Sequence, residues 1–190
     1  MSAFRFLWRT ASDGLSRRLS LGRPALGGNA DVVIRPFRCG EVGLVIARQA
    51  MIYEQEQGWG RPLEALMLET GARFLAEFRP GRDQCWIAEI DGMCVGSVFL
   101  TDEGDGLARL RLLYVEPCAR GQGVADRLVA ACIGFAREAG YARVTLWTHT
   151  VLAAARRLYA RHGFRLVAQA EHDAFGVPVQ GETWDLALER

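Results

Sequence analysis

The chain has 190 residues, of which half are hydrophobic and about a quarter are charged, as expected for a soluble globular protein with a sizeable core. Its 23 basic residues, all arginine, and its 22 acidic residues leave a net charge of +1, which does not favour nucleic acid or an anionic membrane as a partner. No apolar run approaches the roughly eighteen residues of a membrane-spanning helix.

The cysteines and histidines argue against a metal site. Five cysteines and three histidines show no spacing typical of metal ligands, so we expect reduced thiols and no metal. The absence of lysine also excludes any mechanism that needs a lysine side chain.

The chain divides near residue 30. Residues 1–30 hold five arginines against one acid, Asp13. Arg5 and Arg9 interrupt the short apolar stretch, so the segment lacks the unbroken hydrophobic region of a secretory signal. We therefore expect a basic, flexible N-terminal extension over 1–30 and one folded domain over 31–190. A transit peptide would have a similar composition.

From residue 31 onward, the hydrophobic pattern changes repeatedly between the two periods of secondary structure. Apolar residues recur at every second position in the predicted strands and at every third or fourth position in the predicted helices. Asp91-Gly92 is a strong hairpin signal, and Pro62 stands where the first residue of a helix tolerates proline. The predicted elements are strand 31–37, helices 40–57 and 62–78, a strand pair within 84–102, strand 108–117, helix 124–139, strand 142–148, helix 151–163, and strands 164–172 and 181–189.

A glycine-rich stretch, residues 120–123, joins the predicted strand 108–117 to the helix 124–139. Backbone amides that enter a helix are unsatisfied and lie at the positive end of its dipole, so they bind anions such as phosphate. A Walker-type nucleotide site requires a lysine after the glycines. A dinucleotide site requires a third glycine and a carboxylate after the next strand, and the chain offers neither. Two interpretations of the glycine-rich stretch therefore remain: a phosphate-binding loop of another class, or a simple tight turn.

The stretch Arg120-x-x-Gly123-x-Ala125 matches the (Q/R)xxGx(G/A) motif of the GCN5-related N-acetyltransferase (GNAT) superfamily, at that motif's usual place in the chain. The order of elements from residue 31 onward also resembles that superfamily, as does 151–167, in which Tyr159 precedes a Gly-Phe turn. More narrowly, four segments are similar to the acetyltransferase half of bacterial MarR–GNAT fusion proteins: 85–100, 110–123, 145–166 and 181–188.

The resemblance implies an α+β fold in three layers. Its mixed, mostly antiparallel sheet would have about six or seven strands, about four flanking helices, and a V-shaped splay between the fourth and fifth strands. The implied donor is acetyl-CoA, with its pyrophosphate on the amides of 121–126 and an oxyanion held by the amide near Val115. The residues that the resemblance assigns to coenzyme A are Leu113, Tyr114, Val115, Arg120, Gly121, Gln122, Gly123, Val124, Ala125 and Asp126.

Acetylation of an amine also requires acid and base chemistry. An alkylamine with a pKa of about 10.4 is only ~10⁻³ neutral at pH 7, so a base or a desolvating pocket must help. The resemblance implies that Tyr159 protonates the departing thiolate, although a tyrosine on this apolar face could simply be a core residue. Glu116 and His149 are the base candidates, and Glu54 and Glu56 lie where the first helices would line the acceptor site. A water chain without a dedicated base is an alternative.

The acceptor site is less well specified than the donor site. Many relatives carry asparagine where this chain has Leu152, and close relatives often read Trp-Thr-Asn-Asp where it has residues 147–150. These departures concern the acceptor and the base more than the donor. The residues expected to line the acceptor pocket are Tyr53, Glu54, Trp59 and Trp147.

The sequence therefore predicts a bacterial, cytoplasmic N-acetyltransferase that moves an acetyl group from acetyl-CoA directly to an amine on a small molecule or peptide. No nucleic-acid or membrane partner is expected, and a homodimer is compatible with the sequence. The alternative is an acyl-CoA-binding sensor with weak or no turnover.

Overall fold

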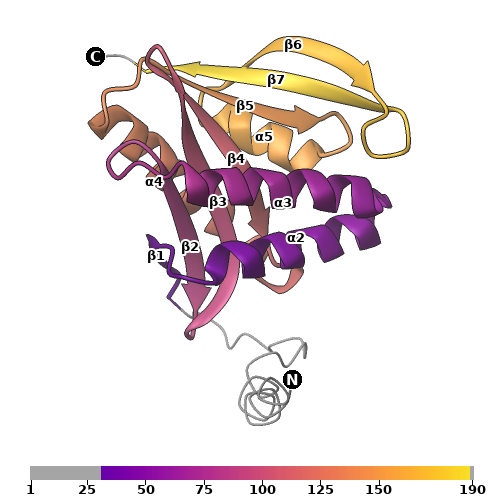
Figure 1. The fold of residues 1–190 in the computed structure, drawn as a ribbon, viewed down its shortest axis with the longest axis horizontal. Coiled ribbons are helices and arrows are strands. Elements are labelled where there is room, and N and C mark those ends of the chain that lie inside the picture. The colour runs from indigo at the N-terminus through magenta and orange to yellow at the C-terminus, as the bar shows by residue number, and fades with distance from the viewer. Residues whose placement is uncertain (1–30, 189–190) are drawn as a thin grey trace, which may run out of the picture.

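The computed structural model describes residues 31–188 (Figure 1), so the extension predicted over 1–30 lies outside the described residues. The elements are β1 (Val33–Pro36), α2 (Glu41–Gln57), α3 (Gly60–Ala76), β2 (Gln84–Ile90), β3 (Met93–Gly104), β4 (Leu107–Val115), the short 3₁₀ helix η1 (Pro117–Ala119), α4 (Val124–Glu138), β5 (Arg143–His149), α5 (Ala153–Arg161), β6 (Arg165–His172) and β7 (Val179–Ala187).

The seven strands form one sheet in the order β1-β2-β3-β4-β5-β7-β6. Only the β4–β5 pair is parallel, and the other neighbours are antiparallel. One hydrophobic core packs α2 and α3 against the sheet, and a second packs α4 and α5 against it, so the sheet is the middle of three layers (Figure 1). The predicted mixed, mostly antiparallel fold is confirmed.

Strands β4 and β5 pair over only part of their length. Leu107–Leu110 pairs with Arg143–Leu146, and no β4–β5 pairing follows in the part of the chain that the structure describes. Beyond Leu110 the two strands part, which is the predicted splay. The β3–β4 register also shifts in this region, where Leu112 has a φ of 48°. A positive φ is costly for a leucine, and such strain is concentrated at functional sites.

Several predicted boundaries shift by about two residues. Helix α3 begins at Gly60, so Pro62 is its third residue and not its first; proline is tolerated there because first-turn amides have no intrahelical partner. Helix α5 begins at Ala153, because the amide of Leu152 instead closes a turn onto the carbonyl of His149 at 3.0 Å. Strand β7 begins two residues earlier than predicted, at Val179.

None of the helices within residues 31–188 combines the length and the apolar character that crossing a bilayer requires. All five cysteines are free thiols.

Candidate active site

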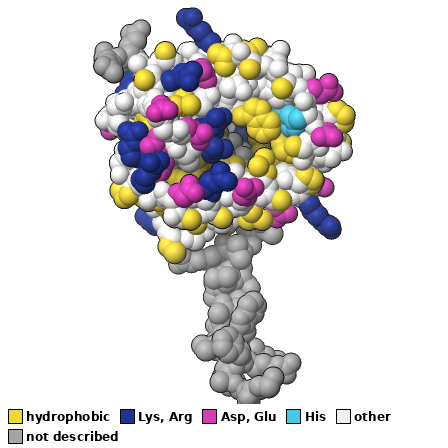
Figure 2. Space-filling model, turned by 45° about the horizontal axis from the view of Figure 1, so that its top comes forward, with side chains coloured by type: hydrophobic (Ala, Val, Ile, Leu, Met, Phe, Trp, Pro, Cys, Tyr) yellow, Lys and Arg dark blue, Asp and Glu magenta, His cyan; other side chains and the backbone are white. Residues whose placement is uncertain are grey.

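A cavity of about 340 Å³ lies where β4 and β5 part. Its lining comes from both splayed strands, from α2, α3 and α5, and from the loop between β6 and β7. Figure 2 shows a hollowed face with hydrophobic and histidine side chains at one rim and arginine side chains at another. The cavity is lined by Gln49, Tyr53, Trp59, Leu63, Leu66, Met67, Thr70, Glu103, Arg109, Leu110, Arg111, Leu112, Leu113, Trp147, Thr148, His149, Leu152, Ala155, Tyr159 and Phe175.

The end of β4 offers main-chain groups to this opening. The amide of Glu116 donates to the carbonyl of Val95 on β3 at 2.8 Å. Because successive amides of a strand point to opposite edges, the amide of Val115 points to the β5 side, where pairing has ceased. The carbonyl of Leu113 accepts from Gln49 Nε2 at 3.3 Å, which fixes the strand beside the cavity.

The glycine loop leads from β4 into α4. Gly121 and Gly123 have φ values of 77° and 76°, and Gly123 is the N-cap of α4 without a side-chain cap. Among residues 31–188, the amides of residues 121–126 donate no hydrogen bond. A Cβ at either glycine would have no atom within 4 Å, so backbone conformation and not packing requires glycine here. The loop is therefore a set of free donors at a helix N-terminus, the arrangement that binds phosphate.

The side chains around the loop have other partners. Gln122 Nε2 donates to the carbonyl of Cys118 at 3.1 Å. Arg120 does not turn toward the loop amides: its Nε donates to the carbonyl of Val115 at 3.2 Å and its Nη1 contacts Glu56 at 2.8 Å.

The first turn of α4 consists of Val124, Ala125 and Asp126, and only Asp126 has a side chain that pairs with another charged group. The carboxylate of Asp126 accepts two bonds from Arg161, at 2.9 and 3.0 Å, and this pairing lowers its pKa. Because Arg161 offsets its charge, Asp126 does not oppose an anion at the loop. The Val124 side chain is buried and Ala125 packs on the same core, so only their amides are available. Tyr114 is also buried, in the opposite core.

Tyr159 lies on α5 and lines the cavity together with Leu113, Leu152 and Ala155. Its side chain is buried, and its ring packs against that of Phe164 at 5.8 Å between centroids. Burial raises the pKa of its phenol, so the hydroxyl keeps its proton at neutral pH. Leu152, which stands where many relatives have asparagine, gives the cavity an apolar wall at this point.

Two of the base candidates are held in ion pairs. Glu116 is buried and accepts from Arg48 at 2.8 and 2.9 Å, and it is not part of the cavity wall. Glu56 is paired with Arg120. An ion-paired carboxylate is a poorer base because its charged form is stabilised.

His149 is a buried cavity residue and not an exposed loop histidine. It ends β5, and its Nε2 lies 3.0 Å from Nε2 of His172. Burial lowers the pKa of His149 to about 4, and His172 adds to this effect. The amide of Ala174 donates to His172 Nδ1 at 3.3 Å, so a neutral His172 carries its proton on Nε2 and donates it to His149.

An aromatic cluster surrounds this histidine pair. The shortest distance between ring centroids is 4.4 Å, for Trp147–His149, and the longest is 6.1 Å, for Trp147–Phe175. The other ring contacts of the cluster lie between these two distances. Gly181 leaves room for it, because a Cβ there would lie 2.8 Å from Trp147 Nε1. The members of the aromatic cluster are Trp59, Trp147, His149, His172 and Phe175.

Three of the four predicted acceptor residues reach the cavity. Tyr53, Trp59 and Trp147 line it, and the Tyr53 and Trp59 rings are stacked at 5.3 Å. Glu54 does not: it is exposed and lies against the start of α3. Sequence reasoning did not find His172 and Phe175, because only the β5–β7–β6 pairing brings them to His149.

The buried His149 gives the fold a testable dependence on pH. Its pKa is near 6.5 in an unfolded chain and about 4 in the fold, so between these values the unfolded state binds the extra proton. Stability from this group is present above about pH 6.5 and falls as the pH drops toward 4. Relative to a His149→Gln variant, the native chain should lose roughly 3 kcal/mol of unfolding free energy between neutral pH and about pH 4.

Urea unfolding of both chains at the two pH values measures this difference. His162→Gln serves as the control, because His162 follows α5 and contacts Asp126 at 3.4 Å, outside the histidine pair. If the unfolding free energies of the native chain and of His149→Gln fell equally between the two pH values, the pKa of His149 would not be lowered in the fold.

No group of three or more histidine, cysteine, aspartate or glutamate side chains able to hold a metal is found within 31–188.

Known proteins resemble this chain both in sequence and in fold. The sequence model described as the Acetyltransferase (GNAT) family matches residues 48–164. An N-acetylaspartate synthetase from Danio rerio is 38% identical over 87 residues, covering 45% of this chain and 31% of that protein. N-acetyltransferase 8 from Homo sapiens is 37% identical over 127 residues, covering 64% and 56%. The chain thus spans about a third to a little over half of these two relatives.

Solved structures share the fold. A ribosomal-protein-alanine N-acetyltransferase from Brucella melitensis aligns with a TM-score of 0.66 and 20% identity, over 82% of this chain and 99% of that one. A putative acetyltransferase from Salmonella typhimurium, solved with its cofactor acetyl-CoA, aligns with a TM-score of 0.65 and 19% identity, over 85% and 96%.

Proposed function

The chain belongs to the acetyltransferase (GNAT) family, and on this premise we propose that it transfers the acetyl group of acetyl-CoA directly to an amine. The observation that carries the proposal is the β4–β5 splay, which leaves this edge of β4 unpaired with β5 near the unpaired amides of residues 121–126. The carbonyls of Leu113 and Val115 on this edge accept from side chains of Gln49 and Arg120. A single extended ligand with a phosphate at one end and a hydrogen-bonding arm at the other suits both features. Membership of the acetyltransferase family thus supports the N-acetyltransferase activity expected from the sequence.

The donor would be held mainly by main-chain groups. The amides of residues 121–126 would bind the pyrophosphate of coenzyme A, and the edge of β4 from Leu113 to Val115 would pair with its pantetheine arm. The amide of Val115, directed toward the gap, would donate to the acetyl oxygen as negative charge develops on it. This stabilisation requires no particular side chain at Val115.

Tyr159 is proposed to assist departure of the coenzyme A sulfur. A thiol has a pKa of about 8.5, whereas burial raises the pKa of this phenol. The hydroxyl is therefore protonated and offers the developing thiolate a hydrogen bond, while full transfer of the phenol proton to the less basic thiolate would be uphill. The buried wall around it keeps water from competing for that bond.

Removal of the amine proton is assigned to desolvation in the cavity. The aromatic cluster and Leu152 give the amine an apolar environment, which favours its neutral, nucleophilic form. His149 stays neutral at pH 7, since its pKa is about 4, and its Nε2 already accepts from His172, so its role is to line the cavity and not to take the amine proton. Glu116 and Glu56, both ion-paired, are assigned no proton transfer.

Further features remain proposals. We propose a cytoplasmic, bacterial protein whose acceptor is the amine of a small molecule or a peptide, and we retain the resemblance to the acetyltransferase half of MarR–GNAT fusions. A homodimer is proposed through β6, because this edge strand exposes Leu166 and Val167 to 41% and 56%, and unpaired strand edges invite pairing with another chain.

Binding of acetyl-CoA is tested by thermal unfolding, with NADH and ATP as comparison ligands. Acetyl-CoA at 100 times its dissociation constant should add about 2.7 kcal/mol, or roughly 5–10 °C for a chain of this size. A shift with acetyl-CoA alone is the expected result. A larger shift with NADH, or none with any ligand for a folded sample, would contradict the proposed donor site.

A further inference from the structure

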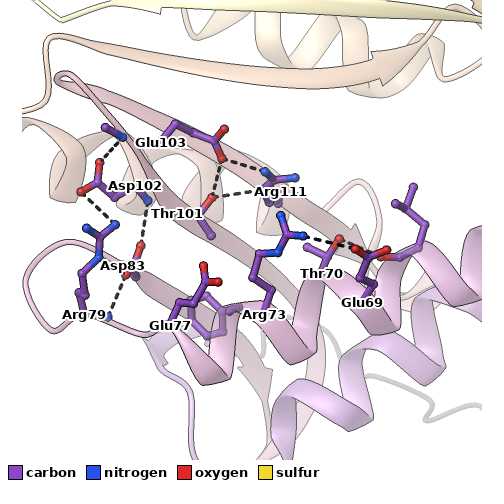
Figure 3. Close-up of a pocket in the computed structure, with 13 residues that line it drawn as sticks. Glu69, Thr70, Arg73, Glu77, Arg79, Asp83, Thr101, Asp102, Glu103 and Arg111 are labelled. Carbon is purple, nitrogen blue, oxygen red and sulfur yellow. Dashed lines mark hydrogen bonds and ion pairs between the residues drawn. The ribbon is translucent and has the colours of Figure 1, made fainter.

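A second, more polar cavity adjoins the first (Figure 3). It has a volume of about 480 Å³ and lies between α3, the loop before β2, and the β3–β4 hairpin. The two cavities share four lining residues: Leu66, Thr70, Glu103 and Arg111. The first cavity therefore lies next to a space with charged walls.

Arg109 and Arg111 stand at this junction with only one carboxylate between them. They are two residues apart on β4 and both line the first cavity, so they share one face of the sheet. Glu103 lies 3.3 Å from Arg109 Nε and 2.8 Å from Arg111 Nη2, and Arg111 Nε donates to Thr101 at 3.1 Å. The Arg109 Nε is buried, and its contact with Glu103 is too poorly aligned for a hydrogen bond.

A third arginine faces the same space from the opposite wall. Figure 3 shows Arg73 on α3 and Arg111 on β4 pointing toward one another. Arg73 contacts only the exposed Glu69, at 3.4 Å, and exposed pairs of this kind are weak. Like charges that face one another across a gap favour an anion between them.

Two other acids of the second cavity have partners away from the junction. Asp83 accepts from the amides of Arg79 and Asp102, at 2.8 Å in each case. The Asp102 carboxylate pairs with Arg79 and Arg82, both at 3.1 Å. Glu77, at the end of α3, is exposed and has no ion pair within residues 31–188 (Figure 3). The local excess of positive charge is therefore confined to the junction, where Arg109 and Arg111 share the single carboxylate of Glu103.

From these contacts we infer that the acceptor amine carries a carboxylate, and that Arg109 and Arg111 bind it, with Arg73 at the outer wall. This inference rests on the proposed function. A guanidinium presents two parallel N–H donors that match a carboxylate. The Val115 amide, assigned above to the acetyl oxygen, lies four strand residues from Arg111, about 13 Å along the strand, so the carboxylate must be separated from the amine by several bonds, as in glutamate or a short peptide.

The experiment compares acids with their own amides as acceptors: L-phenylalanine with L-phenylalaninamide, and L-glutamate with L-glutamine. The first pair varies the α-carboxylate and the second varies the side-chain carboxylate. An amide lacks the negative charge that holds a proton on the neighbouring amine, so intrinsic reactivity favours the amide. We expect kcat/KM to favour the acid in at least one pair, and Arg111→Gln to reduce that preference about tenfold or more.

The ratio of acid to amide separates recognition from damage to the fold, since a structural defect lowers both rates alike. Arg143→Gln is the matched control, because Arg143 is an exposed arginine with a single carboxylate partner, Asp185, at 3.0 Å. Equal rates for acid and amide in the native chain would overturn the inference and leave the proposed function standing. Thiol release with none of these amines would count against both.

Titration of both acid–amide pairs into the native chain in the presence of coenzyme A, followed by NMR, gives a readout independent of turnover. We expect tighter binding of the acid in at least one pair and about tenfold weakening of that binding by Arg111→Gln. Equal affinities for acid and amide in both pairs would overturn the inference even if acetylation is observed.

Discussion

Tyr159→Phe is expected to lower kcat for acetyl transfer by about 100-fold, the usual effect of removing one donor that stabilises developing charge. The phenol lines the cavity from α5 and keeps its proton because burial raises its pKa. Phenylalanine preserves the ring and its contact with Phe164, so the dissociation constant for acetyl-CoA should change little. Steady-state release of coenzyme A thiol gives kcat, and calorimetric titration gives the dissociation constant.

The matched control is Tyr141→Phe. Tyr141 is also a buried tyrosine, and its hydroxyl donates to the carbonyl of Arg82 at 2.9 Å, away from the cavity. This variant should lose about 1 kcal/mol of stability while its kcat stays near the native value. An unchanged kcat in Tyr159→Phe would remove Tyr159 from the mechanism, and an equal loss in both variants would indicate a general effect of losing a buried hydroxyl.

Gly123→Ala is expected to weaken acetyl-CoA binding about tenfold or more. Gly123 has a φ of 76° at the N-cap of α4, a conformation that costs alanine about 1 kcal/mol. Relaxing that strain turns the amides of residues 121–126 away from a common focus, and several charge-assisted hydrogen bonds to a phosphate weaken together. Calorimetric titration with acetyl-CoA measures the effect.

Gly140→Ala separates the loss of the binding site from the loss of stability. Gly140 has a φ of 75°, and a Cβ there also has no atom within 4 Å. Both substitutions therefore place the same strain on the backbone, but Gly140 lies beyond the other end of α4. Equal weakening of acetyl-CoA binding by the two variants would show that the glycine loop has no special role.

The order of elements could be predicted because each one carries a local signal. The hairpin at Asp91-Gly92, the periodic helix after Gly123 and the turn at Gly163 all depend on residues close together in sequence, and the structure has them at these places. Several boundaries differ by two residues, among them the start of helix α5, which depends on a turn between Leu152 and His149 and not on its apolar pattern. Such local competition cannot be read from periodicity.

The candidate site could be predicted only in part. The main-chain donors at the glycine loop follow from a short motif. The surroundings of His149 do not, because His172 becomes its neighbour only through the β5–β7–β6 pairing. The ion pair of Glu116 could not be predicted for a similar reason: Arg48, its partner at 2.8 Å, is 68 residues away in sequence.

The most direct test of the account is acceptor-dependent release of free thiol from acetyl-CoA by the full chain, measured over a panel of amines, with mass spectrometry of the acceptor. The account predicts thiol release that rises with at least one amine and matches the amount of acetylated product. Binding of acetyl-CoA without acceptor-dependent release would contradict it, and would indicate an acyl-CoA sensor built on the same fold.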